Sequence, residues 1–230
     1  LWIDYGRDNY AGVTWSNIPE SDGRRLFLGW MNNWDYGNVV PTHNFRSAMT
    51  LPRELRLAHN GEHLVVASFP VKEVGDEKNG ASIIMDKLTE DTLHIGPDYY
   101  NNGYVLSFTI KPNGLSIFDF TLQNNKGEKI IYTFDTDKKT FIVDRTQSGL
   151  ADFSSNFAIP LIKAPLTKKD SYTIHIWVDK ASTEVFVNGG ELAQTNIAFP
   201  TEPYNQLKFD LRGNIAISVD NITLYKVKHD

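Results

Sequence analysis

The chain of 230 residues contains no cysteine. Disulfide bonds, zinc sites with thiolate ligands and cysteine nucleophiles are therefore excluded. The chain also has no block of basic residues and its net charge is −5, so we expect no nucleic-acid partner. No apolar run reaches the length of a transmembrane helix, so we expect no membrane span.

Familiar catalytic and metal-binding motifs are missing as well. The chain has no G-x-S-x-G nucleophile motif and no glycine-rich phosphate-binding loop. His59 and His63 lie four residues apart, a spacing that brings two metal ligands together only on a helix. Asn60 and Gly61 stand between them and predict a turn. We therefore expect no metal site and no cofactor.

What the chain does contain is apolar residues in period-two alternation. Leu26, Leu28 and Trp30 alternate with their neighbours, which predicts a strand and places Trp30 in the core. Residues 172–180 alternate in the same way. Short strands of this kind, separated by turn-forming residues, predict an all-β fold of sandwich or propeller type.

Two further stretches bear on the organisation of the chain. The nearest candidate for a helix, residues 82–93, fits a strand equally well. Residues 68–82 combine proline, glycine and charged residues, which is typical of a linker. We therefore predict a boundary near residue 70, with one unit at 1–70 and a second at 71–230 that has the size of a two-sheet antiparallel sandwich.

An unusual mixture of indole, phenol and amide groups occurs at residues 29–36, "GWMNNWDY". Flat aromatic rings cover the C–H faces of sugars, while amide, carboxylate and guanidinium groups bind the hydroxyls. Trp34 stands between Asn33 and Asp35 in a polar, loop-like run, where a purely structural indole is not expected. Trp34 is therefore a candidate for contact with a carbohydrate, and core packing is the alternative.

Asp4 and Asp8 are the first carboxylates to consider for catalysis. On an extended strand they share one face, but about 13 Å separates them at 3.3 Å per residue. Glycosidases hold their two carboxyl groups about 5–9.5 Å apart. We therefore expect this pair to bind or to orient other groups rather than to catalyse.

Five segments together resemble one enzyme family. "DYGRDNYAGVTWSN", "GRRLFLGWMNNWDYGNVVPT" and "FRSAMTLPRELRL" resemble the end of the catalytic propeller of glycoside hydrolase family 32. "FIVDRTQSGLADFSSNFA" and "HIWVDKASTEVFVNGGELAQTNIAFP" resemble the β-sandwich that follows it. The resemblance implies an all-β chain in which the last blade of a five-bladed β-propeller precedes a two-sheet antiparallel sandwich. It also implies retaining hydrolysis of β-fructofuranosides, of levanase or exo-inulinase type.

The family's catalytic carboxylates are absent from these segments. The nucleophile, transition-state stabiliser and acid/base of the family lie in W-M-N-D-P-N-G-like, R-D-P and E-C-P motifs, and none of the three occurs here. We therefore assign no catalytic residue and expect the chain to be inactive by itself. The resemblance implies that Trp34 lines the pocket near the fructosyl subsite, with Asn33, Asp8 and Tyr10 at the same rim.

The resemblance also implies partners and a location. The substrate would be levan, inulin or sucrose, bound by an intact enzyme that includes the missing N-terminal blades. A last blade without its neighbours exposes apolar surface, so we predict self-association. The parent protein would be secreted, periplasmic or at the cell surface, with its signal upstream of Leu1.

The sandwich has two competing interpretations. As a lectin-like carbohydrate-binding module it would need an exposed aromatic platform, for which Tyr99, Tyr100 and Tyr104 are the candidates. As structural support for the propeller it needs no ligand site, and we favour this interpretation. Asp179 and Glu184 flank a predicted hairpin and are expected to face solvent.

Overall fold

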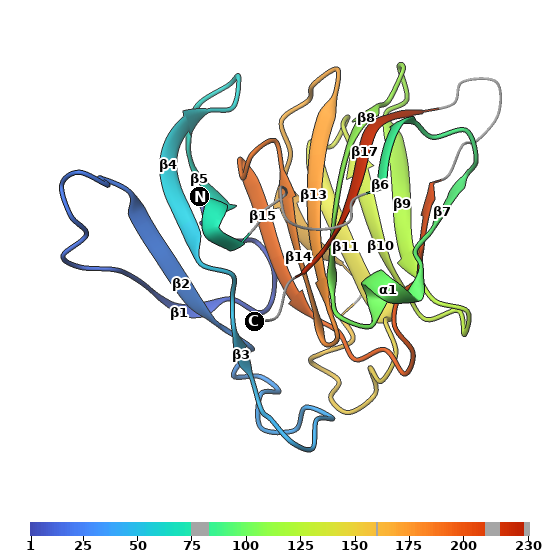
Figure 1. The fold of residues 1–230 in the computed structure, drawn as a ribbon, viewed down its shortest axis with the longest axis horizontal. Helices are drawn as coiled ribbons and strands as arrows, with labels where there is room; N and C mark the ends of the chain where they lie inside the picture. Colours follow the sequence, from blue (N-terminus) through green and yellow to red (C-terminus); the bar gives the residue numbers. More distant parts are fainter. Residues whose placement is uncertain (75–82, 160, 210–216, 228–230) are drawn as a thin grey trace.

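The computed structural model describes residues 1–74, 83–159, 161–209 and 217–227, and it consists mainly of three antiparallel sheets (Figure 1). The first sheet has the strand order β1-β2-β4-β5, with β3 paired to β2. Its strands are β1 (Tyr10–Thr14), β2 (Arg25–Met31), β3 (Ala48–Met49), β4 (Arg53–His59) and β5 (Leu64–Pro70), followed by the short helix η1 (Lys72–Val74).

Two six-stranded sheets follow and face each other as a sandwich. One has the order β12-β11-β10-β9-β16-β7, formed by β7 (Thr92–His94), β9 (Ile117–Gln123), β10 (Lys129–Asp135), β11 (Thr140–Gln147), β12 (Ile162–Pro165) and β16 (Gln206–Phe209). The other has the order β15-β14-β13-β8-β17-β6, formed by β6 (Ile83–Lys87), β8 (Tyr104–Lys111), β13 (Tyr172–Asp179), β14 (Ser182–Val187), β15 (Leu192–Ile197) and β17 (Ser218–Lys226). The four-residue helix α1 (Pro97–Tyr100) precedes β8.

Alternating apolar residues form the core of the sandwich. Phe108 of β8 packs edge-to-face on Phe120 of β9 at 5.3 Å between ring centroids, and both are fully buried. Phe134 of β10 and Ile174 of β13 belong to the same core. Aromatic rings bury large areas and favour such edge contacts, so they hold the two sheets together. The predicted all-β sandwich is confirmed.

The first sheet lies beside β15, the edge strand of the sandwich (Figure 1). The N-terminal segment runs along this edge, where the amides of Tyr5 and Asp8 donate to the carbonyls of Ala193 and Thr195 at 2.9 and 3.1 Å. An exposed edge strand invites uncontrolled pairing with other chains. The N-terminal segment covers that edge and at the same time joins the first sheet to the sandwich.

Residues 82–93 contain no helix in their described part, residues 83–93, which carry β6 and the start of β7. The predicted linker, residues 68–82, lies partly outside the described residues, from 75 to 82. The expectation that Trp30 belongs to the core was wrong. The sandwich covers the opposite face of β2, where Met31 packs with Ile197 and Phe199, so Trp30 stays half-buried.

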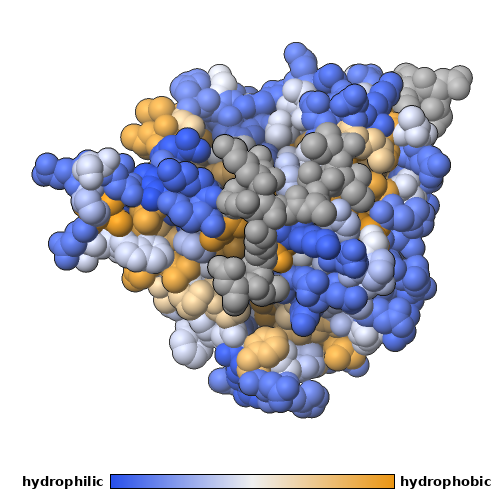
Figure 2. All heavy atoms as spheres, in the orientation of Figure 1, coloured by the Kyte–Doolittle hydropathy of each residue, from blue (hydrophilic) through white to orange (hydrophobic). Residues whose placement is uncertain are grey.

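Apolar surface is concentrated on the first sheet and its loops (Figure 2). Of the fifteen exposed large apolar side chains among the described residues, twelve belong to residues 1–66. A sheet that completed its own core would not leave so many uncovered. In the described part of the chain, no helix has the length and the hydrophobicity needed to cross a membrane.

Candidate functional site

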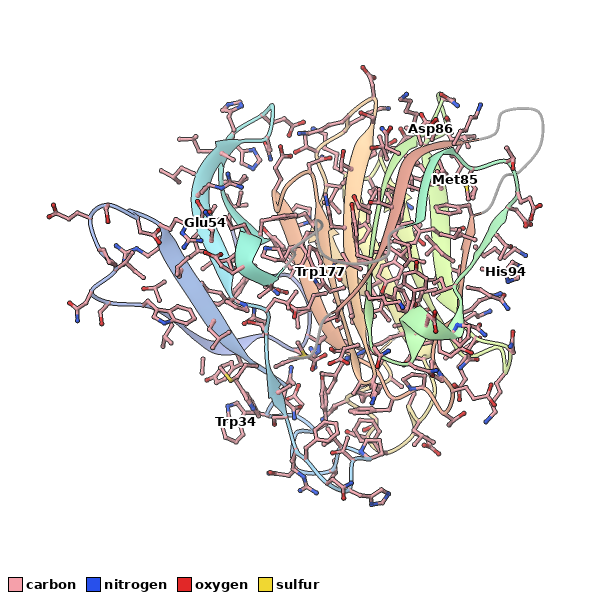
Figure 3. The ribbon with its side chains drawn as sticks, in the orientation of Figure 1. Trp34, Glu54, Met85, Asp86, His94 and Trp177 are labelled. Atoms are coloured by element: carbon pink, nitrogen blue, oxygen red, sulfur yellow. The ribbon has the colours of Figure 1, made fainter. Side chains whose placement is uncertain are left out.

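Three aromatic rings gather at one end of the first sheet and form what we call the aromatic cluster: Tyr10, Trp30 and Trp34. Tyr10 and Trp30 are cross-strand neighbours on β1 and β2, with ring centroids 6.4 Å apart. Trp34 lies 5.2 Å from Trp30 and 6.4 Å from Tyr10. Trp34 is 66% exposed and Tyr10 is 54% exposed, and Figure 3 shows Trp34 outside the sandwich. The cluster thus offers flat aromatic faces to a ligand.

The turn that carries Trp34 is closely hydrogen-bonded. The carbonyl of Asn33 accepts from the amide of Gly37 at 2.7 Å, and its side-chain oxygen accepts from the amide of Asp35 at 2.9 Å. The Asn33 side-chain amide donates to the Arg7 carbonyl at 2.8 Å. Asn33 therefore shapes the turn, and the structure leaves little of its side chain for a ligand.

A charged pair stands beside Trp34. The Arg7 guanidinium lies 2.8 Å from the Asp35 carboxylate, and both side chains are partly exposed. Such groups bind sugar hydroxyls well, because they offer several donors and acceptors in fixed positions. Neither Arg7 nor Asp35 was among the binding residues expected from the sequence, where Asp35 stood out only as a neighbour of Trp34.

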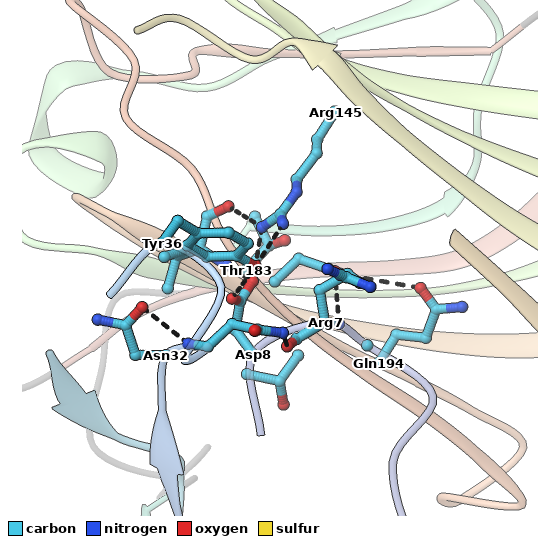
Figure 4. A network of polar contacts seen from close by, with 12 residues as sticks. Arg7, Asp8, Asn32, Tyr36, Arg145, Thr183 and Gln194 are labelled. Carbon is cyan, nitrogen blue, oxygen red and sulfur yellow. Dashed lines mark hydrogen bonds and ion pairs between the residues drawn. The ribbon is translucent and has the colours of Figure 1, made fainter. Parts of the chain in front are cut away.

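Asp8 lies behind this surface in a fully buried network (Figure 4). One carboxylate oxygen accepts from the Arg145 guanidinium at 2.5 Å and from the amide of Ile197 at 2.8 Å. The other accepts from the Tyr36 hydroxyl at 2.5 Å. A buried carboxylate with both oxygens occupied has no free face for a sugar, so the structure places Asp8 away from the predicted rim.

Arg145 and Tyr36 complete this network. Arg145 donates to the Tyr36 hydroxyl at 2.7 Å, and its guanidinium carbon lies 4.0 Å from the centre of the Phe157 ring. Burial, together with the Asp8 carboxylate, raises the pKa of the Tyr36 phenol above its ordinary value. The phenol therefore stays protonated and donates to Asp8 across the ordinary pH range.

A second buried network centres on Arg53. Its guanidinium lies 2.7 Å from Asp4 and 2.5 Å from Glu184, and it donates to the Thr195 hydroxyl at 2.5 Å. Burial alone would raise the pKa of Asp4, but the Arg53 charge and the hydrogen bonds from Thr195 hold it below the ordinary value. Burial raises the pKa of Glu184, with Arg53 acting against this rise.

The expectation that Glu184 faces solvent was therefore wrong. Its side chain is buried, and its carboxylate accepts hydrogen bonds from Arg53 and from the amide of Leu51 across the interface.

The sequence does contain a signal for the buried arginine of the first network, Arg145. Arg145 follows Phe141 and Val143 at period two, which places it on the inward face of β11.

The sandwich carries a separate pocket of about 300 Å³. Tyr100 and Tyr104 line it, together with Asp179, Lys180 and the loop 200–204. Of the three tyrosines proposed as a platform, Tyr99 and Tyr104 are buried, so only Tyr100 is accessible. Tyr104 instead donates to the Tyr204 carbonyl at 3.0 Å.

Among the described residues, no group of three or more histidine, cysteine or acidic residues is arranged to hold a metal ion. Asp4 and Asp8 are both buried in ion pairs, and Asp35, which follows Trp34, pairs with Arg7. What the cluster and the Arg7–Asp35 pair offer together is flat ring faces beside hydrogen-bonding groups.

Comparison with known proteins identifies two matching family profiles. The profile "Glycosyl hydrolases family 32 C terminal" matches residues 77–226, and the profile "Glycosyl hydrolases family 32 N-terminal domain" matches residues 1–68. The aromatic cluster thus lies in the part that matches the N-terminal domain. Arg145 and Glu184 lie in the part that matches the C-terminal domain.

Individual relatives agree with these profiles. The chain is 34% identical to a levanase of Bacillus subtilis (strain 168) over 99% of this chain and 34% of the levanase. It is 30% identical to an extracellular exo-inulinase of Aspergillus awamori over 87% of this chain and 38% of that protein. The crystal structure of exo-inulinase from Aspergillus awamori superposes with a TM-score of 0.81, at 26% identity, over 99% of this chain and 44% of that one. The chain therefore spans about a third to a half of the length of these relatives.

Proposed function

The chain belongs to the glycosyl hydrolases of family 32, and from this premise we propose that it is the C-terminal part of a fructan-degrading hydrolase. The proposed enzyme releases fructose from levan or inulin, or from sucrose, by a retaining mechanism. The observation that carries the proposal is the exposed aromatic cluster on the sheet that matches the family's N-terminal domain.

In this proposal the chain supplies binding groups to a site completed by the rest of the enzyme. The Trp34 indole covers the C–H face of a fructosyl ring, and Tyr10 lies at its rim. Asn33 keeps Trp34 in place through its turn, while Arg7 and Asp35 lie within reach of the sugar hydroxyls. Asp8 has a structural role because it is buried.

The chemical step needs residues from outside this chain. Retention requires a nucleophile and an acid/base about 5–5.5 Å apart. Asp4 and Asp8 are committed to Arg53 and Arg145, and the catalytic motifs of the family are absent from the sequence. We therefore expect the purified chain to release no fructose from levan, inulin or sucrose.

Location and partners are part of the same proposal. The exo-inulinases that the chain resembles are described as extracellular, which supports secretion of the parent protein. The uncovered apolar side chains of residues 1–66 support contact with the preceding propeller blades. Without those blades, another copy of the chain is the expected partner.

A carbohydrate-binding role for the sandwich is the second candidate. The pocket of about 300 Å³ beside Tyr100 favours it, since Asp179 and Lys180 lie at its edge. Titration with fructan oligosaccharides tests this candidate: binding that is lost in Tyr100→Ala would support it. Absence of binding leaves the sandwich with a structural role only.

The decisive experiment for the main proposal is kinetic. In the full-length hydrolase, Trp34→Ala should lower kcat/KM for levan or inulin by about tenfold, which corresponds to about 1.4 kcal/mol. Trp15→Ala is the matched control, because Trp15 is also exposed but lies outside the aromatic cluster. Unchanged kinetics in Trp34→Ala, or fructose release by the 230-residue chain alone, would overturn the proposal.

A further inference from the structure

We propose that Arg145, a residue of the sandwich, is a positioning residue for Trp34 and acts through Tyr36. It would hold the turn 32–37 in the one arrangement that presents the Trp34 indole to the sugar. The kinetic part of this inference rests on the proposed function, but its structural part does not.

The geometry connects Arg145 to the turn directly. Its Nη2 donates to the Tyr36 hydroxyl at 2.7 Å, across 109 residues of sequence. Its Nη1 donates to the Asp8 carboxylate at 2.5 Å and to the Ile197 carbonyl at 2.8 Å. One guanidinium from β11 therefore fixes both Tyr36, two residues after Trp34, and Asp8, which follows Arg7 (Figure 4).

Residues on both sides of Trp34 are held by these contacts. Arg7 accepts a hydrogen bond from the Asn33 side chain at 2.8 Å and pairs with Asp35 at 2.8 Å. Tyr36 is held by Arg145. Residues before and after Trp34 are thus tied to the Arg7–Asp8 segment. Arg145 joins that segment to the sandwich through the Asp8 side chain, while the backbone amides of the segment bond Asn196 and Thr195.

The presence of an arginine at position 145 favours a positioning role over a role in stability alone. A buried ion pair is often no more stabilising than apolar side chains of similar volume, so stability alone does not require this residue. A guanidinium has donors in fixed directions and can orient two partners at once. The Phe157 ring, 4.0 Å from the guanidinium carbon, packs on its face and limits its rotation.

Arg53 provides the comparison within the same interface. It is equally buried and also joins the first sheet to the sandwich, through Asp4 and Glu184. None of its described polar contacts reaches the turn 32–37. If buried arginines acted here only by stabilising the interface, Arg53 and Arg145 would be equivalent for Trp34.

Indole resonances of the 230-residue chain test the structural part. The Trp34 signal in a ¹H–¹⁵N spectrum is identified by its loss in Trp34→Phe. We expect Tyr36→Phe and Arg145→Lys to shift this signal, and we expect Arg53→Lys, the matched control, to leave it in place. Tyr36→Phe keeps the ring and the Arg145–Asp8 ion pair, so it decides the question if Arg145→Lys does not fold.

Kinetics of the full-length hydrolase test the consequence for substrate. A misplaced group can lower the rate of reaction by up to about 100-fold. Because Trp34 is proposed to bind the substrate, we expect Tyr36→Phe to raise KM about fivefold and to keep kcat within about twofold. Arg53→Lys should lower the melting temperature without raising KM.

The outcomes separate the two proposals. A Trp34 signal that stays unchanged in Tyr36→Phe, or that moves as much in Arg53→Lys, overturns the positioning role whatever the enzyme hydrolyses. A signal that shifts as expected while Trp34→Ala leaves the kinetics unchanged supports the positioning of the indole and overturns its assignment to fructan binding.

Discussion

Arg53 and Glu184 form an ion pair with 2.5 Å between Nη2 and Oε2, although 131 residues separate them in the sequence. Both side chains are buried, and Asp4 joins the pair from the N-terminal segment. The pair links β4 of the first sheet to β14 of the sandwich. The two parts of the chain therefore share buried charges, which makes their separation costly.

Removal of the Arg53 charge should destabilise the folded chain strongly. Arg53→Met leaves Asp4 and Glu184 buried without their partner, and we expect a loss of about 3–5 kcal/mol. Urea unfolding followed by tryptophan fluorescence measures it. Lys139→Met is the control, because it breaks an exposed pair with Glu62 and should change little. Equal effects of the two substitutions would contradict a special role of burial.

Gly6 is required by the close approach of the N-terminal segment to β15. A Cβ at this position would lie 2.0 Å from the carbonyl oxygen of Thr195, which is backbone and cannot move aside easily. Overpacking typically costs about 1–3 kcal/mol, so Gly6→Ala should lower the melting temperature by about 2–12 °C. Gly96→Ala, where nothing lies within 4 Å, should be tolerated. Similar melting temperatures for both variants would exclude this tight contact.

His175 should make stability depend on pH. Burial lowers the pKa of His175 to about 4, and the unfolded chain binds the proton near pH 6.5. The unfolded state therefore gains a proton first as the pH falls. The free energy of unfolding should decrease between pH 6.5 and 4 by at most about 3 kcal/mol from this residue.

His175→Leu isolates this contribution. Other titrating groups are common to both proteins, so the stability of the wild type minus that of the variant should fall by about 3 kcal/mol from pH 7 to pH 4. Urea unfolding at a series of pH values provides the difference. A difference that does not change with pH would show that His175 accepts a proton in the folded chain as easily as in the unfolded chain.

The purified chain should self-associate through the exposed face of β4 and β5 near the turn that joins them. Leu57 and Val66 are a cross-strand pair, and Leu64 lies on the same face. Leu57 is 77% exposed and Leu64 is 62% exposed, which is costly for apolar side chains without a partner. Sedimentation velocity should show oligomers that increase with concentration, and Leu57→Lys with Leu64→Lys should reduce them. A clean monomer at high concentration would contradict the prediction.

The sequence by itself determined the local part of the structure. Alternation at period two is a property of neighbouring residues, so the strands and the all-β class could be predicted from it. Turns are equally local: Asn188 and Gly189 adopt positive φ values of 50° and 65°, the conformation that asparagine–glycine pairs favour in hairpin turns. The aromatic cluster was partly predictable too, because Trp34 stands in a polar run where a core indole is not expected.

Only the tertiary structure decided which face of each strand is buried and which charges meet. Alternation shows that Trp30 and Met31 point to opposite sides, but Ile197 and Phe199 of the sandwich, more than a hundred residues along the chain, determine which side is covered. Arg145 stands at an inward position, yet nothing near it indicates Asp8 or Tyr36 as partners. Contacts between distant segments depend on how the sheets pack, and that information is spread over the whole chain rather than held in any short stretch of it.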